Sequence, residues 1–139
     1  MTAAALDHIR QAAGGAAASP EFLQQMREGL PVEAVRWLAQ DIAPSESGFA
    51  ERLVPRATLA RFKARRRLSQ AASERIVRIS NIWNLALTVF QNRDKAYRFL
   101  TTPNLMLGNQ LPLDVALDGE AGGRRVENIL GRLLYGAAA

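Results

Sequence analysis

The spacing of apolar residues over residues 70–91 most constrains the fold, because it places them on one face of a long helix. These residues follow one another at intervals of three and four, as the 3.6-residue turn of an α-helix requires. They are Ala72, Ile76, Ile79, Trp83, Ala86 and Phe90. No stretch of the chain sustains the alternation of apolar and polar residues that is typical of strands. The sequence therefore predicts an all-α fold.

Boundary residues divide the first part of the chain into short helices. Ser19 and Pro20 suit the N-cap and the first position of a helix that stops near Gly29. Pro31 opens a second helix, and Ser45 is expected to cap a third. The expected helices after the first span about 31–43, 45–53 and 56–66.

The second part of the chain shows the same organisation. Asn92 can cap a helix that stops before Pro103, and Pro112 starts one or two helical turns. We expect 103–111 to be an ordered loop in which Leu105, Met106 and Leu107 are buried, and both tryptophans, Trp37 and Trp83, to lie in the core. A last helix over about 121–135 carries an apolar stripe of Val126, Ile129, Leu130, Leu133 and Leu134.

The composition excludes several classes of protein. With 139 residues, of which 48% are hydrophobic, the chain can form one domain or two small lobes. It has no apolar run of the roughly 18 residues that a membrane span needs, and no signal peptide is recognised at its start. There is no cysteine and one histidine, His8, so neither a disulfide nor a zinc site is expected, and a cytoplasmic location is the default. No Gly-rich phosphate loop or HExxH pattern occurs, so we expect no enzyme and no cofactor.

Positive charge is concentrated in one stretch. Seven of the eighteen Lys and Arg residues lie between Arg52 and Arg67, and no acid falls in that window. The rest of the chain has eleven cations and thirteen acids, so this stretch accounts for the whole positive surplus. A polyanionic partner is the functional interpretation. A solvated cationic helix face is the alternative.

The order of a short helix, the tight corner Val54-Pro55 and a short basic helix is the helix-turn-helix pattern. Phe49, Leu53, Leu59 and Phe62 are expected to pack inward, and the corner lacks the glycine that many such turns use. Arginine can bind phosphates or grip a guanine edge with two bonds. The expected DNA-binding residues are Arg56, Thr58, Arg61, Lys63, Arg65, Arg66 and Arg67.

Four segments in order resemble one family. GLPVEAVRWLAQ precedes the helix-turn-helix, RLSQAASERIVRISNIWNLALTVF leads into NRDKAYRFLTTPNLMLGNQLPLDVAL, and RRVENILGRLLYG closes the chain. From about Leu30 to its end the chain resembles the Xre/MbcA/ParS family of antitoxins. Phe99 stands where a tryptophan is common in the family, and only Ala137–Ala139 follow the last helix.

The resemblance implies an antitoxin of a type II toxin–antitoxin pair. Its N-terminal lobe would be Xre/Cro-like and repress the operon by binding operator DNA. Its C-terminal lobe would cover the active site of a RES-domain toxin, an enzyme that consumes NAD or transfers ADP-ribose. Antitoxin homodimers in hetero-oligomers with the toxin are implied. The expected organisation is a mobile arm at 1–18, a helix-turn-helix lobe at 19–68 and a toxin-binding lobe at 69–139.

The polar side of the last helix is then a candidate toxin-binding surface. Its cations could take the place of substrate-binding groups near a dinucleotide pocket or pair with the toxin's acids. Tyr135 could anchor the interface. An ordinary wet helix face is the alternative. The expected toxin-binding residues are Arg124, Arg125, Glu127, Asn128, Arg132 and Tyr135.

Two other functions fit parts of the sequence. A stand-alone helix-turn-helix regulator without a toxin would explain residues 45–67 equally well, with the C-terminal lobe as a dimerisation module. A pure inhibitor would use the basic helix to bind its partner and would have no operator. Binding to DNA upstream of the gene separates the inhibitor from the other two.

Overall fold

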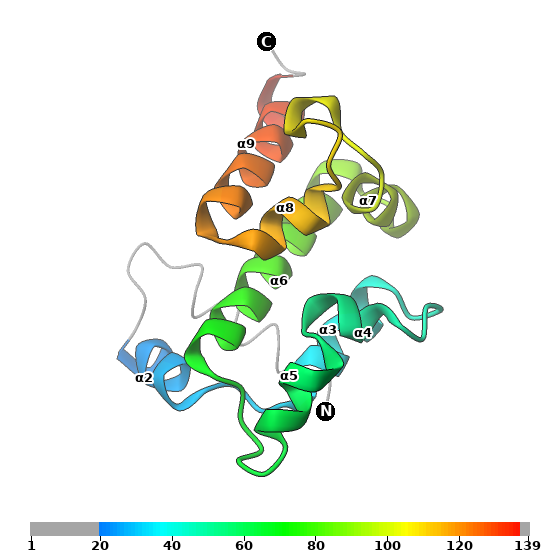
Figure 1. The fold of residues 1–139 in the computed structure, drawn as a ribbon. Helices are drawn as coiled ribbons and strands as arrows, with labels where there is room; N and C mark the ends of the chain where they lie inside the picture. The colour runs from blue at the N-terminus through cyan, green and yellow to red at the C-terminus, as the bar shows by residue number, and fades with distance from the viewer. Residues whose placement is uncertain (1–19, 137–139) are drawn as a thin grey trace. The chain divides into compact units, whose positions relative to one another are not determined.

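The structure, a computed structural model, describes residues 20–136, and within that range it consists of helices joined by turns and loops, with no strand (Figure 1). The prediction of an all-α fold is confirmed. The expected arm at 1–18, the Ser19 cap and the tail Ala137–Ala139 lie outside the described residues. The elements are α2 (Pro20–Glu28), α3 (Glu33–Ile42), α4 (Phe49–Leu53), α5 (Arg56–Phe62), α6 (Gln70–Phe90), α7 (Arg93–Leu100), η1 (Leu105–Leu107), α8 (Pro112–Asp118) and α9 (Glu120–Gly136).

The chain divides into two compact units, one up to Ser80 and one from Asn81. The first unit contains α2 to α5 and the first half of α6, and the second contains the rest. The division falls inside α6, whereas the sequence placed the boundary before this helix, between residues 68 and 69.

The core of the first unit is built from one face each of α3, α4 and α6. Burial of a large aliphatic or aromatic side chain stabilises the fold by about 1.5–3 kcal/mol, so these faces hold the short helices in place. The fully or nearly fully buried residues are Ala34, Val35, Leu38, Ile42, Phe49, Leu53, Ile76 and Ile79. The helical stripe of α6 is therefore confirmed in this unit.

A close approach of two loops completes the first unit. Gly29 has a φ of +92°, and a Cβ on this residue would overlap the carbonyl oxygen of Leu68. Only glycine fits both conditions at low cost. The Leu68 amide donates to the Leu30 carbonyl at 2.8 Å, and the Leu30 amide donates to Ser73 Oγ at 2.8 Å. These bonds tie the start of α6 to the α2–α3 connection.

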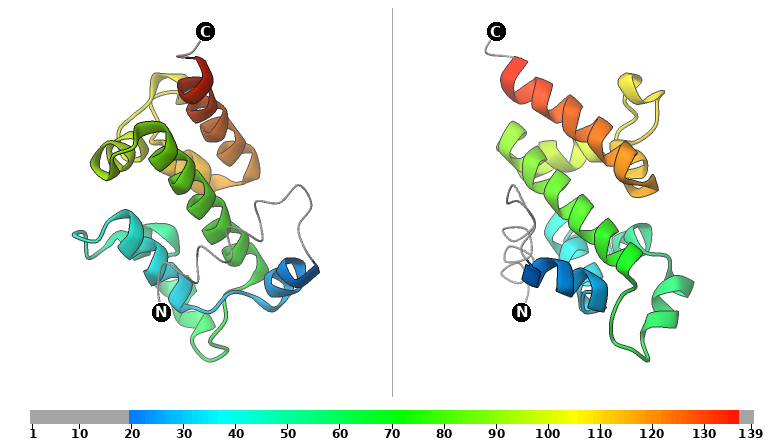
Figure 2. Two further views of the ribbon diagram at one scale, coloured as in Figure 1. Left: turned by 180° about the vertical axis from the view of Figure 1, so that it is seen from behind. Right: turned by 90° about the vertical axis from the view of Figure 1, so that its left-hand side faces the viewer.

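The second unit is organised around the pair α8 and α9, which pack on each other where the chain turns sharply at Gly119 (Figure 2). Gly122 permits this contact, because a Cβ there would overlap the carbonyl oxygen of Val115. Trp83 is fully buried, as expected. The Asn92 cap is confirmed, since its side chain accepts a bond from the Lys95 amide at 2.9 Å.

Two helix boundaries differ from the expected ones, the start of α4 and the end of α5. Helix α4 begins at Phe49, with Gly48 as its N-cap and no side-chain cap, because consecutive turns occupy the chain from Ala43 to Phe49. The predicted cap by Ser45 was therefore wrong. Helix α5 ends at Phe62 instead of 66, and a turn closed by the bond from the Arg66 amide to the Lys63 carbonyl follows it.

Several apolar residues are less buried than expected. Leu59 and Phe62 are only half-buried, and Leu59 lies on the wall of a hollow of about 480 Å³ that residues of α3 and α4 also line. Trp37 is also half-buried. Leu133 continues the apolar stripe of α9 but is 47% exposed, since the helix extends past the core it covers.

Candidate nucleic-acid and partner interfaces

The corner between α4 and α5 is formed by two extended residues. Val54 has φ −139° and ψ 121°, and Pro55 has φ −55° and ψ 146°. Neither residue needs a positive φ, so the absence of a glycine at this corner has a structural explanation. The Leu59 amide donates to the Pro55 carbonyl at 2.9 Å, which starts α5 directly after the corner.

Helix α4 is firmly held, and it positions α5. Phe49 and Leu53 are fully buried, and Arg75 of α6 donates from Nη1 to the Leu53 carbonyl at 3.3 Å. This bond satisfies a carbonyl at the end of α4 that lacks a partner within the helix. The Arg52 guanidinium lies 5.4 Å from the centre of the Phe49 ring. Helix α5 itself buries no residue completely, and Arg56, Ala57, Ala60 and Arg61 on it are exposed.

Arg56, the first cation of α5, is engaged by the preceding helix. Its guanidinium forms an ion pair and hydrogen bonds with the Glu51 carboxylate. The hydrogen bond and the negative charge of Glu51 raise the pKa of Arg56 above its ordinary value. Part of its positive charge is therefore balanced within the protein.

Arg67, at the other end of the basic stretch, contacts the backbone of a distant loop. Its Nη1 donates to the Gly29 carbonyl at 3.0 Å, and its backbone forms an isolated bridge with Pro31. The Val32 amide also donates to the Arg66 carbonyl at 3.2 Å. The turn that carries the last arginines is thus fastened to the α2–α3 connection, and Arg66 is held there at a φ of 59°.

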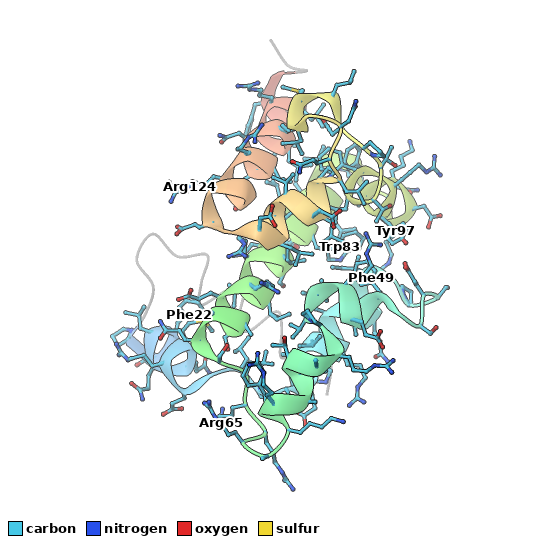
Figure 3. The ribbon with its side chains drawn as sticks, viewed as in Figure 1. Phe22, Phe49, Arg65, Trp83, Tyr97 and Arg124 are labelled. Atoms are coloured by element: carbon cyan, nitrogen blue, oxygen red, sulfur yellow. The ribbon has the colours of Figure 1, made fainter. Side chains whose placement is uncertain are left out.

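Four cations between these two are exposed: Arg61, Lys63, Arg65 and Arg66. Figure 3 shows Arg65 on the turn that follows α5. Their side chains form no ion pair with any acid in residues 20–136. Thr58 is half-buried. The structure therefore separates the expected DNA-binding residues into four unpaired surface cations and two arginines with partners in the protein.

The candidate partner surface of the second unit includes one face of α9. Arg124 pairs with Glu120 at 3.1 Å, and Figure 3 shows it on the outer side of the helix. Both side chains are well exposed, so this pair contributes at most about 0.5 kcal/mol to stability. Glu127, Asn128, Arg132 and Tyr135 are exposed along the same helix.

Three of the expected toxin-binding residues lie together beside η1. Arg125 donates from Nη2 to the Met106 carbonyl at 3.3 Å. Asn128 and Arg132 follow it at helical spacing of three and four residues. A small hollow of about 190 Å³ is lined by Met106, Leu107, Arg125, Asn128, Ile129 and Arg132.

The segment η1 contradicts the expectation that all three of its apolar residues are buried. Leu107 is buried, but Leu105 is 84% exposed and Met106 is 55% exposed. In a 3₁₀ turn successive side chains point about 120° apart, so three consecutive residues cannot share one buried face. Asn104, Gly108 and Asn109 around this segment were the signal in the sequence for such a tight turn.

None of the helices in the described residues is long and apolar enough to cross a membrane.

Comparison with protein families accounts for both units. The antitoxin Xre-like helix-turn-helix domain matches residues 21–81, which include the α4–α5 corner and the basic turn. The antitoxin Xre/MbcA/ParS C-terminal toxin-binding domain matches residues 85–136, which include η1 and α9. Families of these two kinds are in general not enzymatic. Comparison with curated proteins gives no match. The chain belongs to the Xre/MbcA/ParS family of antitoxins, with a helix-turn-helix domain followed by a toxin-binding domain.

Proposed function

We propose that this antitoxin neutralises a RES-domain toxin by binding over its active site and represses its own operon by binding operator DNA. The toxin consumes NAD or transfers ADP-ribose from it. The observation that carries the proposal is the match of residues 85–136 to a toxin-binding domain of this family. The assignment of a RES-domain partner is supported by the resemblance of the segments 92–117 and 124–136 to this family.

DNA binding is supported by the charge distribution of the first unit. Arg61, Lys63, Arg65 and Arg66 are exposed and unpaired on and after the second helix of the helix-turn-helix. Phosphate contacts by such residues release counterions, and each contact lowers the slope of log K against log salt by about 0.9. A homodimer would read two half-sites about 34 Å apart, which compensates for the modest affinity of one small protomer.

Toxin binding is supported by the exposed face of the second unit. Arg124, Arg125 and Arg132 can pair with acids around the toxin's active site or occupy the place of groups that bind the substrate's phosphates. Glu127, Asn128 and Tyr135 extend this face along α9. The proposed inhibitory surface therefore consists of the three arginines and these three residues of α9.

The test uses the protein encoded by the gene next to this one, expressed in bacteria alone and together with the antitoxin. We expect the neighbour alone to stop growth and lower cellular NAD if the toxin is of the NAD-consuming kind, and co-expression to restore both. For a toxin that transfers ADP-ribose, labelled ADP-ribose on cellular proteins is the corresponding measurement.

The loss-of-function control is a double charge reversal, Arg125→Glu with Arg132→Glu. This variant is expected not to restore growth when it is co-expressed with the neighbour. Truncation at Gly122 is less informative, because it also removes the buried residues Val126, Ile129 and Leu130 from the core. A harmless neighbour that does not bind the antitoxin would overturn the toxin partner and leave a DNA-binding regulator.

A further inference from the structure

Exposed large apolar side chains are concentrated in the second unit. Among the described residues, five large hydrophobic side chains are exposed, and four of them lie in the toxin-binding domain. Leu105 is the most exposed of the five, at 84%, and its neighbour Met106 is 55% exposed. Two adjacent apolar side chains in water are unfavourable by themselves, so their exposure points to a partner.

The turn that carries these residues is well ordered by hydrogen bonds. Asn104 Oδ1 accepts from the Met106 amide at 2.9 Å, and the Asn104 carbonyl accepts from the Asn109 amide at 2.9 Å. The Asn104 amide donates to the Gln110 carbonyl at 3.0 Å, and Leu107 anchors the turn in the core. Leu105 and Met106 are therefore presented on a preorganised support, which lowers the entropic cost of binding.

Positive charge flanks the apolar pair. Arg125 reaches the Met106 carbonyl, and Arg132 lies on the wall of the same hollow beside Met106. No acidic residue lines this hollow. The combination of a central apolar projection and a cationic edge fits a partner with an apolar recess and acidic residues around it.

We propose that Leu105 and Met106 of η1 form the apolar centre of the toxin-binding surface, inserting into an apolar recess of the toxin whose acidic rim pairs with Arg125 and Arg132. This inference rests on the proposed function and names the part of the domain that makes the central contact. A second copy of this chain fits less well. A two-fold contact centred here would set Arg125 and Arg132 of one protomer against the same residues of the other.

The experiment measures the affinity of the full-length antitoxin for the protein encoded by the neighbouring gene. Leu105→Asp and Met106→Asp are each expected to weaken binding at least tenfold, and the double variant at least a hundredfold. Arg125→Glu with Arg132→Glu is expected to weaken binding at least tenfold and to reduce its dependence on salt.

The controls lie on α2 in the other unit. Leu23→Asp changes an exposed leucine, and Arg27→Glu changes an exposed arginine. Both are expected to bind within threefold of the unaltered chain. Circular dichroism melting verifies the fold of every variant. Where an aspartate variant is misfolded, the milder Leu105→Ser and Met106→Ser variants are used. They are expected to weaken toxin binding as well, but by a smaller factor.

The outcomes separate the two proposals. If the unaltered chain binds and the folded Leu105 and Met106 variants bind equally well, the apolar centre is refuted while the antitoxin function stands. If the unaltered chain does not bind the neighbour, both proposals fall. If the variants instead change the mass of the free antitoxin in light scattering and leave toxin affinity intact, the surface is a contact between copies, which also refutes the inference.

Discussion

At the scale of single residues, neighbouring arginines of the basic stretch have different physical environments. Arg56 is balanced by Glu51, and Arg67 holds the Gly29 carbonyl, whereas Arg65 is exposed without an acidic partner. All three were expected to contact DNA from their type and position alone. The sequence could not single out Arg67, because its partner is 38 residues away along the chain.

This difference predicts that alanine at Arg67 lowers stability, whereas alanine at Arg65 weakens DNA binding. Arg67→Ala removes a bond to the backbone and should lower the free energy of unfolding by about 1 kcal/mol. Arg65→Ala should change it by less than about 0.5 kcal/mol. Arg65→Ala should instead weaken binding to DNA upstream of the gene and reduce the magnitude of the salt slope by about 1.

Denaturant unfolding and gel shifts at several salt concentrations check both variants. A normal stability of Arg67→Ala combined with a reduced salt slope would show that Arg67 binds a phosphate and is not a support of the turn. Equal affinity for upstream and unrelated DNA would contradict the proposed operator.

At the scale of elements, the short segments α5 and η1 differ most from the predicted bounds and burial. The 21-residue helix α6 was predicted within one residue, because six apolar positions define its face. Helix α5 has seven residues and η1 has three, so too few positions define a face. Their burial is decided by neighbouring elements, which is why Leu59 and Leu105 were placed wrongly.

The contact between α8 and α9 gives a prediction at this scale. Gly122→Ala places a Cβ on the Val115 carbonyl and should cost about 2–3 kcal/mol by forcing the helices apart. Gly131→Ala is the matched change, because it lies in the same helix and a Cβ there meets no atom within 4 Å. It should stabilise the helix by about 0.5–1 kcal/mol. Thermal melting of both variants measures the difference, and equal melting temperatures would contradict the close packing.

At the scale of the whole molecule, the two candidate surfaces share no residue. The basic turn lies in the unit that ends at Ser80, and η1 with α9 lies in the unit that begins at Asn81. The two family matches divide near the same point, since one ends at residue 81 and the other begins at residue 85. DNA binding and toxin binding should therefore be separable by mutation.

Two double variants test this separation, one that reverses charges of the basic turn and one that replaces the exposed apolar residues of η1 by aspartate. Arg61→Glu with Arg65→Glu should abolish binding to the upstream DNA and leave growth rescue from the neighbouring gene product intact. Leu105→Asp with Met106→Asp should have the reverse effect. Gel shifts and growth curves on the same two proteins provide the comparison. Loss of both activities in either folded variant would contradict separate surfaces.

Four properties could be predicted from the order of residues alone: the helical class, the buried face of α6, the location of the helix-turn-helix and the identity of the family. These properties depend on local spacing, boundary residues and segment order, all of which are present along the chain. The folded chain was needed to establish which cations lack a partner within the protein and which apolar residues of η1 face water. Those properties depend on contacts such as Arg67 with Gly29 and Arg125 with Met106, which join residues distant in sequence and form only when the chain is folded.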